Sequence, residues 1–262
     1  MRGREDLTVT PLRIGCVKYL NARPLIYGWP GEVVLGHPAS LCAQLAKGAF
    51  DVALVSSFEF LCNPIYRIVD GISISSDGPV YSVIVAHHGE ISELTEIELD
   101  PAAQSSVNLL RCLLAERNLN IRLVPRSTSS ISNRRALLLI GDQAILLRQK
   151  RGDEFRYWDL GNEWKKLVDL PFVYALWLVR PEVRDAKKVA AQLRALRNEN
   201  LRQIDRLIAA EKEFDPQFCR RYYEKHLRFT FGEQEKEGLR QFQRICAKHN
   251  LLPERDLSFN LV

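Results

Sequence analysis

An amide, an arginine and two tyrosines follow directly after a short apolar segment near the start of the chain. Residues 12–17 read LRIGCV, and residues 17–29 read VKYLNARPLIYGW. In open α/β sheets, ligands bind outside the carboxyl ends of the strands, so a small-molecule site would begin in this loop. Asn21 is therefore the first candidate for a ligand contact. The alternative is that Asn21 is an ordinary turn residue and that Arg23-Pro24 is a loop-to-helix junction.

Serines lie at the ends of two further apolar segments, residues 52–55 and 72–74, and inside a third, residues 80–85. They are Ser56, Ser57, Ser75, Ser76 and Ser82, and Asp77-Gly78 completes the second cluster. Hydroxyls and glycine-exposed backbone amides bind carboxylates and hydroxyls without bringing charge of their own. This pattern favours a small, anionic, oxygen-rich ligand. The alternative is that the serines only stabilise turns and helix starts.

The length and composition favour two lobes. A chain of 262 residues is long for one compact core and comfortable for two lobes of ordinary size. Hydrophobic residues make up 46% and charged residues 26%, as in globular proteins. No run of about eighteen apolar residues is present, and the start, MRGREDLTVTPLR, lacks the apolar segment of a signal peptide. We therefore expect a cytoplasmic protein that does not associate with membranes.

Scattered cysteines and histidines argue against a metal site. The six cysteines form no C-x-x-C pair and have no histidine at ligand spacing, so we expect buried free thiols and no metal or other cofactor. His87-His88 has no partner in the sequence, and we place it at a hinge or on the surface. The net charge of +5 arises largely from a helical stretch without aromatic residues. We expect no nucleic-acid binding and a modest attraction for acidic metabolites; the oligomeric state is not predicted.

Strands alternate with helices along the chain, which predicts an α/β protein with mainly parallel sheets. In the first lobe we expect helices from Pro24 and from Ser40 to Gly48, and strands at 12–17, 32–35, 52–55, 68–74 and 80–85. In the second lobe we expect a helix at 105–118 and strands ending near 99, 125 and 141.

A continuous apolar strand at 171–179 is expected to return to the first lobe, and the rest of the chain is expected to be helical. The predicted domains are residues 11–86 together with 178–262, and residues 87–177. Residues 1–10 form an N-terminal extension.

Six blocks of the chain resemble the chorismate dehydratase family in order and spacing. They are YLNARPL, DVALVSSFEF, ISISSDGPVYSVIV, LDPAAQSSVNLL, ALLLIGDQAI and WDLGNEWKKLVDLPFVYALWLV, within residues 11–182. The resemblance implies the two-lobed fold of type II periplasmic binding proteins, with a ligand cleft between the lobes. It also implies dehydration of chorismate to 3-[(1-carboxyvinyl)oxy]benzoate, the first step of the futalosine route to menaquinone.

By resemblance, Asn21 and Ser82 are the candidate catalytic residues. Ser82 would donate a hydrogen bond to the departing C4 hydroxyl, and Asn21 would orient that hydroxyl or the side-chain carboxylate. Two groups are considered as the base that removes the C3 proton. Glu59 lies just past Ser56-Ser57, although a carboxylate is electrostatically poor beside a doubly negative substrate. The other base is the enolpyruvyl carboxylate of the substrate itself.

The candidate substrate-binding residues are Ser56, Ser57, Ser75, Ser76, Ser105, Ser106, Gly141 and Asp142. Ser105 and Ser106 would present hydroxyls and free amides to a carboxylate if a helix begins there. A helix with Asp100 as N-cap and Pro101 at its first position would instead use those amides in helical bonds. We expect Gly141 to permit close backbone approach and Asp142 to brace its turn.

The chain departs from the family pattern at two places. Ala103-Gln104 stand where serine and arginine are usual, which alters how this lobe handles charge. Val168-Asp169 stand where threonine and glycine are common, and we expect only a local backbone change there.

Two other functions are weighed. A lyase of the same pathway opens cyclic dehypoxanthine futalosine, but it would need a histidine base, and no strand-end cluster contains a histidine. A non-catalytic solute-binding protein would share the cleft and release its ligand unchanged.

Overall fold

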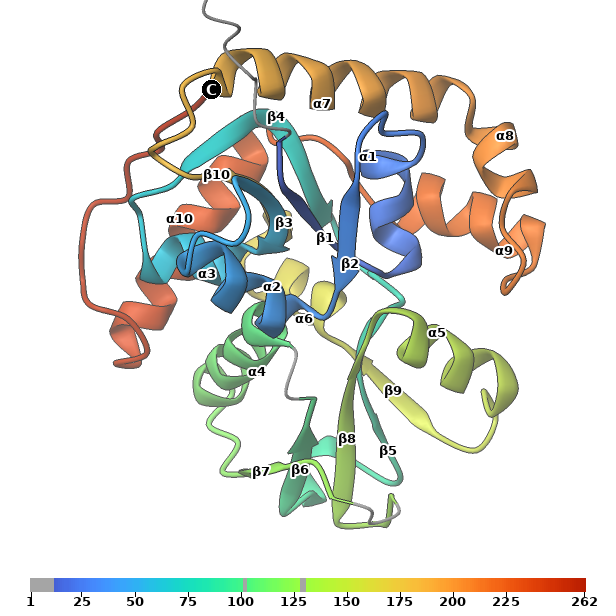
Figure 1. Cartoon of the computed structure of the whole chain (residues 1–262). Coiled ribbons are helices and arrows are strands. Elements are labelled where there is room, and N and C mark those ends of the chain that lie inside the picture. The colour runs from blue at the N-terminus through green and yellow to red at the C-terminus, as the bar shows by residue number, and fades with distance from the viewer. Residues whose placement is uncertain (1–11, 101–102, 128–130) are drawn as a thin grey trace, which may run out of the picture.

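The computed structural model describes residues 12–100, 103–127 and 131–262, whose strands form two five-stranded sheets in two lobes (Figure 1). The first sheet has the order β2-β1-β3-β10-β4, and the second has the order β7-β6-β8-β5-β9. The predicted two-lobed α/β architecture is confirmed. The N-terminal extension predicted at residues 1–10 lies outside the described residues.

The first sheet consists of β1 (Ile14–Val17), β2 (Val33–Gly36), β3 (Val52–Ser56), β4 (Arg67–Ser76) and β10 (Phe172–Val179). Every residue of β1, β3 and β10 is buried, which explains their unbroken apolar sequences. The helices α2 (Pro38–Ala46), α3 (Ser57–Cys62), α7 (Ala186–Arg202) and α10 (Glu233–Lys248) pack against this sheet. Helix α2 begins before the predicted Ser40 because Pro38 at its first position already has a helical φ.

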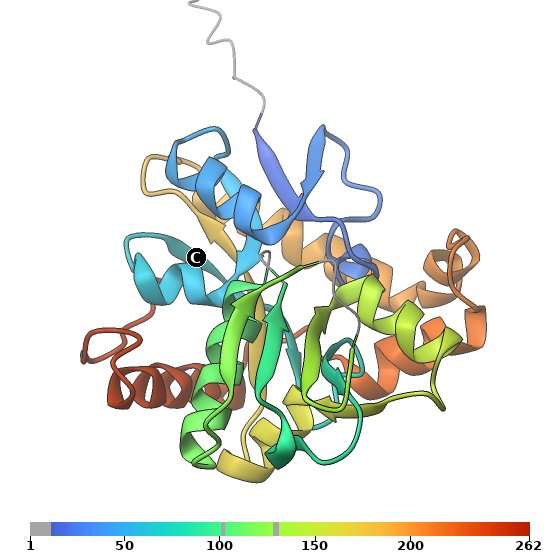
Figure 2. The ribbon, with the colours of Figure 1, turned by 90° about the horizontal axis from the view of Figure 1, so that it is seen from below.

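The second sheet consists of β5 (Val83–His87), β6 (Glu96–Leu99), β7 (Arg122–Pro125), β8 (Arg135–Ile140) and β9 (Arg156–Asp159). Its helices are α4 (Gln104–Glu116), α5 (Gly141–Lys150) and α6 (Leu160–Val168), and a 3-10 turn, η2, covers Ile91–Glu93. Figure 2 views the molecule from the side of this lobe, with β8, β5 and β9 running alongside one another.

In each sheet four of the five strands run in one direction and a single strand opposes them, so the sheets are mainly parallel in strand direction, as predicted, but contain antiparallel pairings that were not predicted. Strand β1 is parallel to β2 and β3, but β10 runs antiparallel to β3 and β4. In the second sheet, β6 is parallel to β7 and β8, whereas β5 runs antiparallel to β8 and β9. Each antiparallel strand follows a crossing between the lobes: β5 is the first strand after the chain enters the second lobe, and β10 is the first strand after it returns to the first lobe.

The chain crosses between the lobes earlier than predicted. Strand β4 ends at Ser76 in the first sheet, and β5 begins at Val83 in the second, so the strand placed at 80–85 in the first lobe was wrongly assigned. The return crossing lies between Val168 and Phe172. We propose domain boundaries at these two crossings. Since His87 ends β5, the His87-His88 pair does not lie at a crossing, and its interpretation as a hinge is wrong.

The C-terminal region is helical, as predicted. It contains α7, α8 (Ile204–Ala209), α9 (Pro216–Arg221), a π-helical turn η3 (Tyr222–His226) and α10. After β1, the chain forms a 3-10 turn, η1 (Leu20–Ala22), and a short helix, α1 (Arg23–Ile26), which packs against α7. This arrangement places η3 close to the segment that carries Asn21.

An aromatic cluster joins the two lobes. The ring of Trp164 in α6 lies 5.3 Å from that of Phe172 in β10, and Phe172 lies 4.8 Å from Phe242 in α10. All three side chains are fully buried. Edge-to-face pairs of this kind contribute about 0.5–1.5 kcal/mol each beyond burial. The second lobe is thereby anchored to the last helix of the first.

The six cysteines are free, and all except the exposed Cys62 are buried, so the expectation of buried free thiols is confirmed for five of them. Across the described ranges, no group of three His, Cys, Asp or Glu side chains is arranged to hold a metal ion. No helix in those ranges is long and apolar enough to cross a membrane.

The departure at Val168-Asp169 affects only the end of α6. Asp169 is the C-cap residue of α6 and has a left-handed φ of 57°, a conformation that glycine adopts at lower cost. Its carboxylate pairs with Lys165 of the same helix at 2.8 Å.

Candidate active site

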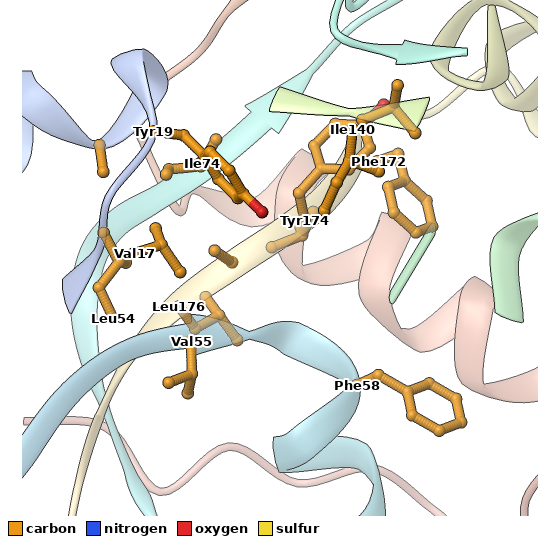
Figure 3. Close-up of a cluster of buried hydrophobic side chains, with 14 of the residues drawn as sticks. Val17, Tyr19, Leu54, Val55, Phe58, Ile74, Ile140, Phe172, Tyr174 and Leu176 are labelled. Carbon is orange, nitrogen blue, oxygen red and sulfur yellow. The ribbon is translucent and has the colours of Figure 1, made fainter. Parts of the chain in front are cut away.

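A pocket lies between the two sheets and encloses about 540 Å³ of space, including the part that is open to solvent. Its apolar wall includes Tyr19, Ile74 and Tyr174 from the first lobe and Ile140 from the second. Figure 3 shows these four side chains within one buried cluster. The pocket thus forms where the two lobes meet, as the predicted cleft requires.

The structure brings together six of the sequence-predicted site residues in the pocket wall. They are Asn21, Ser56, Ser82, Ser105, Ser106 and Gly141. They come from segments far apart in the sequence: the loop after β1, the end of β3, the first crossing, the start of α4 and the start of α5.

Asn21 carries an unused hydrogen-bond acceptor. Its Oδ1 atom is buried and has no partner among the described residues. The flanking residue Leu20 is held on both sides, because its N–H donates to Asp142 Oδ1 at 2.9 Å and its carbonyl accepts from Tyr223 at 3.1 Å. A buried polar atom without a partner costs free energy, so it marks a position where a ligand donor would be favoured.

Ser82 is fully buried and directly precedes β5. Its Oγ accepts a hydrogen bond from the Tyr222 hydroxyl at 2.6 Å, and its carbonyl accepts one from the Gly141 N–H at 2.8 Å. The preceding residue, Tyr81, has a positive φ of 68°. Such a backbone conformation in a residue other than glycine is strained and is typical of functional sites.

Three serine hydroxyls form a network beneath the pocket. Ser105 Oγ lies 2.6 Å from Ser56 Oγ and 3.0 Å from Ser57 Oγ, and it donates to the Tyr174 carbonyl at 3.0 Å. Helix α4 begins at Gln104, which decides against the alternative start at Asp100. The network ties the start of α4 to β3 and β10, and so fixes the helix start at the pocket.

Four predicted binding residues do not line the pocket. Ser57 donates to the Val173 carbonyl at 2.6 Å, and Ser76 donates to the Gly78 carbonyl at 3.1 Å. Ser75 pairs through its backbone with Arg228. Its neighbour Ile74 faces the pocket, and because successive side chains of a strand alternate, the Ser75 side chain points to the other face of the sheet. Asp142 accepts a hydrogen bond from the Leu20 N–H of the other lobe, whereas it was expected to brace its own turn.

Among the residues that the structure describes, none with a Lys, Arg, His, Asp or Glu side chain lines the pocket. Residues at the starts of α2, α4 and α5 line the wall instead, but only α4 has free backbone N–H groups there, because the α2 residue is Pro38 and the Gly141 N–H of α5 donates to the Ser82 carbonyl. None of these three helices has a side-chain cap at its N-terminus. Uncapped helix N-termini present free N–H groups and favour bound anions.

Glu59, one of the two proposed bases, is absent from the pocket wall. It is buried within α3, where its Oε1 accepts from Asn63 at 2.8 Å. This position disfavours Glu59 as the base.

The two lobes contact each other directly beside the pocket. Gly141 packs against the ring of Tyr19 and has a positive φ of 58°. The adjacent Asp142 bonds to Leu20 across the same contact. Burial raises the pKa of Asp142 to about 6, and the hydrogen bond from the Leu20 N–H opposes this shift.

Several wall residues were not predicted as binding residues. Tyr19 and Tyr174 contribute rings, and burial raises the pKa of both hydroxyls, so both stay neutral. Gln104 also lines the pocket, and its Oε1 is buried without a partner in the described part of the chain. In the sequence, only the departure from the family pattern at Ala103-Gln104 drew attention to Gln104.

This architecture defines a class: a two-lobed protein of the periplasmic-binding-protein type whose neutral pocket lies between the lobes. The crystal structure of an Archaeoglobus fulgidus protein has the same fold, with a TM-score of 0.71 and 18% identity, over 92% of this chain and 98% of that one. The Escherichia coli periplasmic aliphatic sulphonate binding protein also shares it, with a TM-score of 0.63 and 14% identity, over 94% and 95%.

The chain belongs to the menaquinone biosynthesis family, which it matches over residues 12–248. It is 29% identical to the chorismate dehydratase of Thermus thermophilus over 255 residues, which cover 88% of this chain and 94% of that protein.

Proposed function

We propose that this protein is a lyase that dehydrates chorismate to 3-[(1-carboxyvinyl)oxy]benzoate, the first step of futalosine-dependent menaquinone biosynthesis. The observation that carries the proposal is a neutral pocket in which a partnerless amide oxygen, Asn21 Oδ1, and the hydroxyl of Ser82 share one wall. Family membership and the similarity to a chorismate dehydratase support it.

The pocket suits a substrate with two carboxylates and a ring hydroxyl. The uncapped start of α4 offers backbone N–H groups to a carboxylate, and the Ser106 hydroxyl lies at the same helix start. The apolar rings of Tyr19 and Tyr174 suit the cyclohexadiene ring. A pocket that binds both a carboxylate and the ring of chorismate selects one conformer of the substrate. This favours the elimination over the other reactions open to chorismate.

The elimination removes hydroxide from C4 and a proton from C3. Asn21 Oδ1 accepts a hydrogen bond from the C4 hydroxyl and orients it, while Ser82 donates to the oxygen of that hydroxyl as negative charge develops there. The electrons of the C3–H bond form the new double bond, and the proton and hydroxide together make the released water. The ring becomes aromatic, which provides the driving force.

We assign the base to the enolpyruvyl carboxylate of the substrate, because the described residues of the wall include no carboxylate, imidazole or amine, and the two wall tyrosines stay protonated. Replacing Glu59 by glutamine is therefore expected to leave kcat within about threefold of the wild-type value, since Gln retains the acceptor for Asn63. Steady-state rates with chorismate provide the measurement. Complete loss of turnover in a folded Glu59→Gln enzyme would restore Glu59 as the base.

A negative charge at Gln104 is expected to weaken substrate binding. The Gln104→Glu side chain has nearly the same shape but places a carboxylate in the wall, so KM should rise about tenfold, equivalent to about 1.4 kcal/mol, while kcat changes little. The matched control is Gln143→Glu, because Gln143 is exposed on α5 and is absent from the wall. An unchanged KM in Gln104→Glu would contradict an anionic ligand at this helix start.

Incubation of the purified protein with chorismate tests the function. Formation of an aromatic product, followed by its absorbance and mass, is the expected result. Turnover of cyclic dehypoxanthine futalosine instead would identify the sister lyase. Recovery of tightly bound but intact chorismate would identify a solute-binding protein. Either outcome rejects the proposal.

A further inference from the structure

Tyr222 lies behind the two proposed catalytic residues but outside the pocket wall. It is the first residue of η3, is fully buried, and stacks on Phe218 with ring centroids 5.6 Å apart. Its hydroxyl donates to Ser82 Oγ at 2.6 Å. The Asn21 side chain also approaches this hydroxyl, closely enough to counter part of the rise in its pKa that burial causes.

The neighbouring residues of η3 hold the segments that carry Asn21 and Ser82. Tyr223 donates to the Leu20 carbonyl at 3.1 Å, directly beside Asn21. His226 Nδ1 lies 2.9 Å from the Pro79 carbonyl, in the crossing that leads to Ser82. A π-helical turn is uncommon and is frequently found at functional sites. Here the turn contacts both segments at once.

The hydrogen-bond directions decide what Tyr222 does. A phenol has one proton, and Tyr222 uses it on Ser82 Oγ. The Ser82 hydroxyl proton cannot point back along that bond, and within the described residues no acceptor bonds to it. The proton is therefore directed away from Tyr222, toward the pocket that Ser82 lines.

We infer that Tyr222 is a positioning residue that fixes Ser82 as a hydrogen-bond donor to the departing hydroxyl of the substrate, an inference that rests on the proposed function. Tyr222 acts through Ser82 and makes no contact with the substrate. Because burial raises the pKa of Tyr222, the phenol stays protonated and acts as a fixed donor. The proton released from C3 leaves with the hydroxide as water, so no proton from Tyr222 is consumed.

The test compares Tyr222→Phe with the wild type. Phenylalanine keeps the stacked ring, so we expect kcat to fall about tenfold, KM to stay within about twofold and the shape of the kcat–pH profile to stay the same. Tyr66→Phe is the matched control, because Tyr66 is also buried but lies outside the wall. It should leave kcat unchanged. Thermal unfolding of both variants checks that they fold.

A double-mutant cycle with Ser82→Ala distinguishes positioning from general support of the structure. If Tyr222 acts through Ser82, adding Tyr222→Phe to Ser82→Ala should lower kcat by less than about twofold further. A full additional tenfold loss would overturn the inference, as would an unchanged kcat in Tyr222→Phe alone. A wild-type protein that fails to convert chorismate would instead reject the proposed function.

Discussion

Replacing Ser82 by alanine is expected to lower kcat for chorismate about 10²-fold while KM changes less than about threefold. Ser82 is the hydroxyl in the wall that Tyr222 directs toward the pocket, and it would stabilise charge that develops only as the C4–O bond breaks. An interaction that strengthens in the transition state affects kcat more than KM. The initial rate of aromatic product formation gives both constants.

The matched control for this prediction is Ser75→Ala. Ser75 is equally buried in a serine-rich strand, but its contacts are with Arg228, outside the pocket. Its removal should leave kcat within about twofold of wild type, since the Ser75 side chain does not line the pocket. Near-normal turnover of Ser82→Ala, with an unchanged unfolding temperature, would remove Ser82 from the mechanism.

Substitution of Gly141 by alanine is expected to reduce kcat/KM at least about 30-fold. A Cβ atom at this position would lie 2.7 Å from the Tyr19 ring, and the φ of 58° is unfavourable for alanine. The Gly141 N–H also donates to the Ser82 carbonyl, so a shift at Gly141 is transmitted to the catalytic segment. Kinetics should show the loss, and solution scattering should show more widely separated lobes.

Gly71→Ala provides the control for backbone strain alone. Gly71 has a φ of 78°, but nothing lies within 4 Å of an added Cβ. This variant should lose about 1 kcal/mol of stability and keep its activity. If Gly141→Ala behaves in the same way as Gly71→Ala, then contact between Tyr19 and Gly141 is not needed for catalysis.

The elements were largely predictable because local sequence patterns encode them. The short, unbroken apolar run 171–179 is rich in aromatic residues and valine, which predicts a buried strand, and β10 is buried throughout. The direction of that strand could not be predicted in the same way. Whether a strand runs parallel or antiparallel depends on the lobe from which the chain arrives, which is a property of the whole path.

The candidate site was predicted in part. Asn21, Ser82 and Gly141 lie at strand or crossing ends, and the structure places all three in the pocket wall. Ser75 and Ser76 occur in an equally suggestive cluster, yet their hydroxyls bond within the protein. Tyr222 could not be found from its sequence, because a tyrosine in a helical segment is an ordinary core residue until the fold places it against Ser82.

The sequence by itself determined the two-lobed α/β class and the strand ends where polar groups gather. These features follow from residue types and short-range periodicity. Only the tertiary structure decided which serines face the pocket, that the uncapped start of α4 lies at its wall, and that Tyr222 bonds to Ser82. The physical reason is that these contacts join residues far apart in the chain, whose distances and hydrogen-bond directions are set by the packing of both lobes.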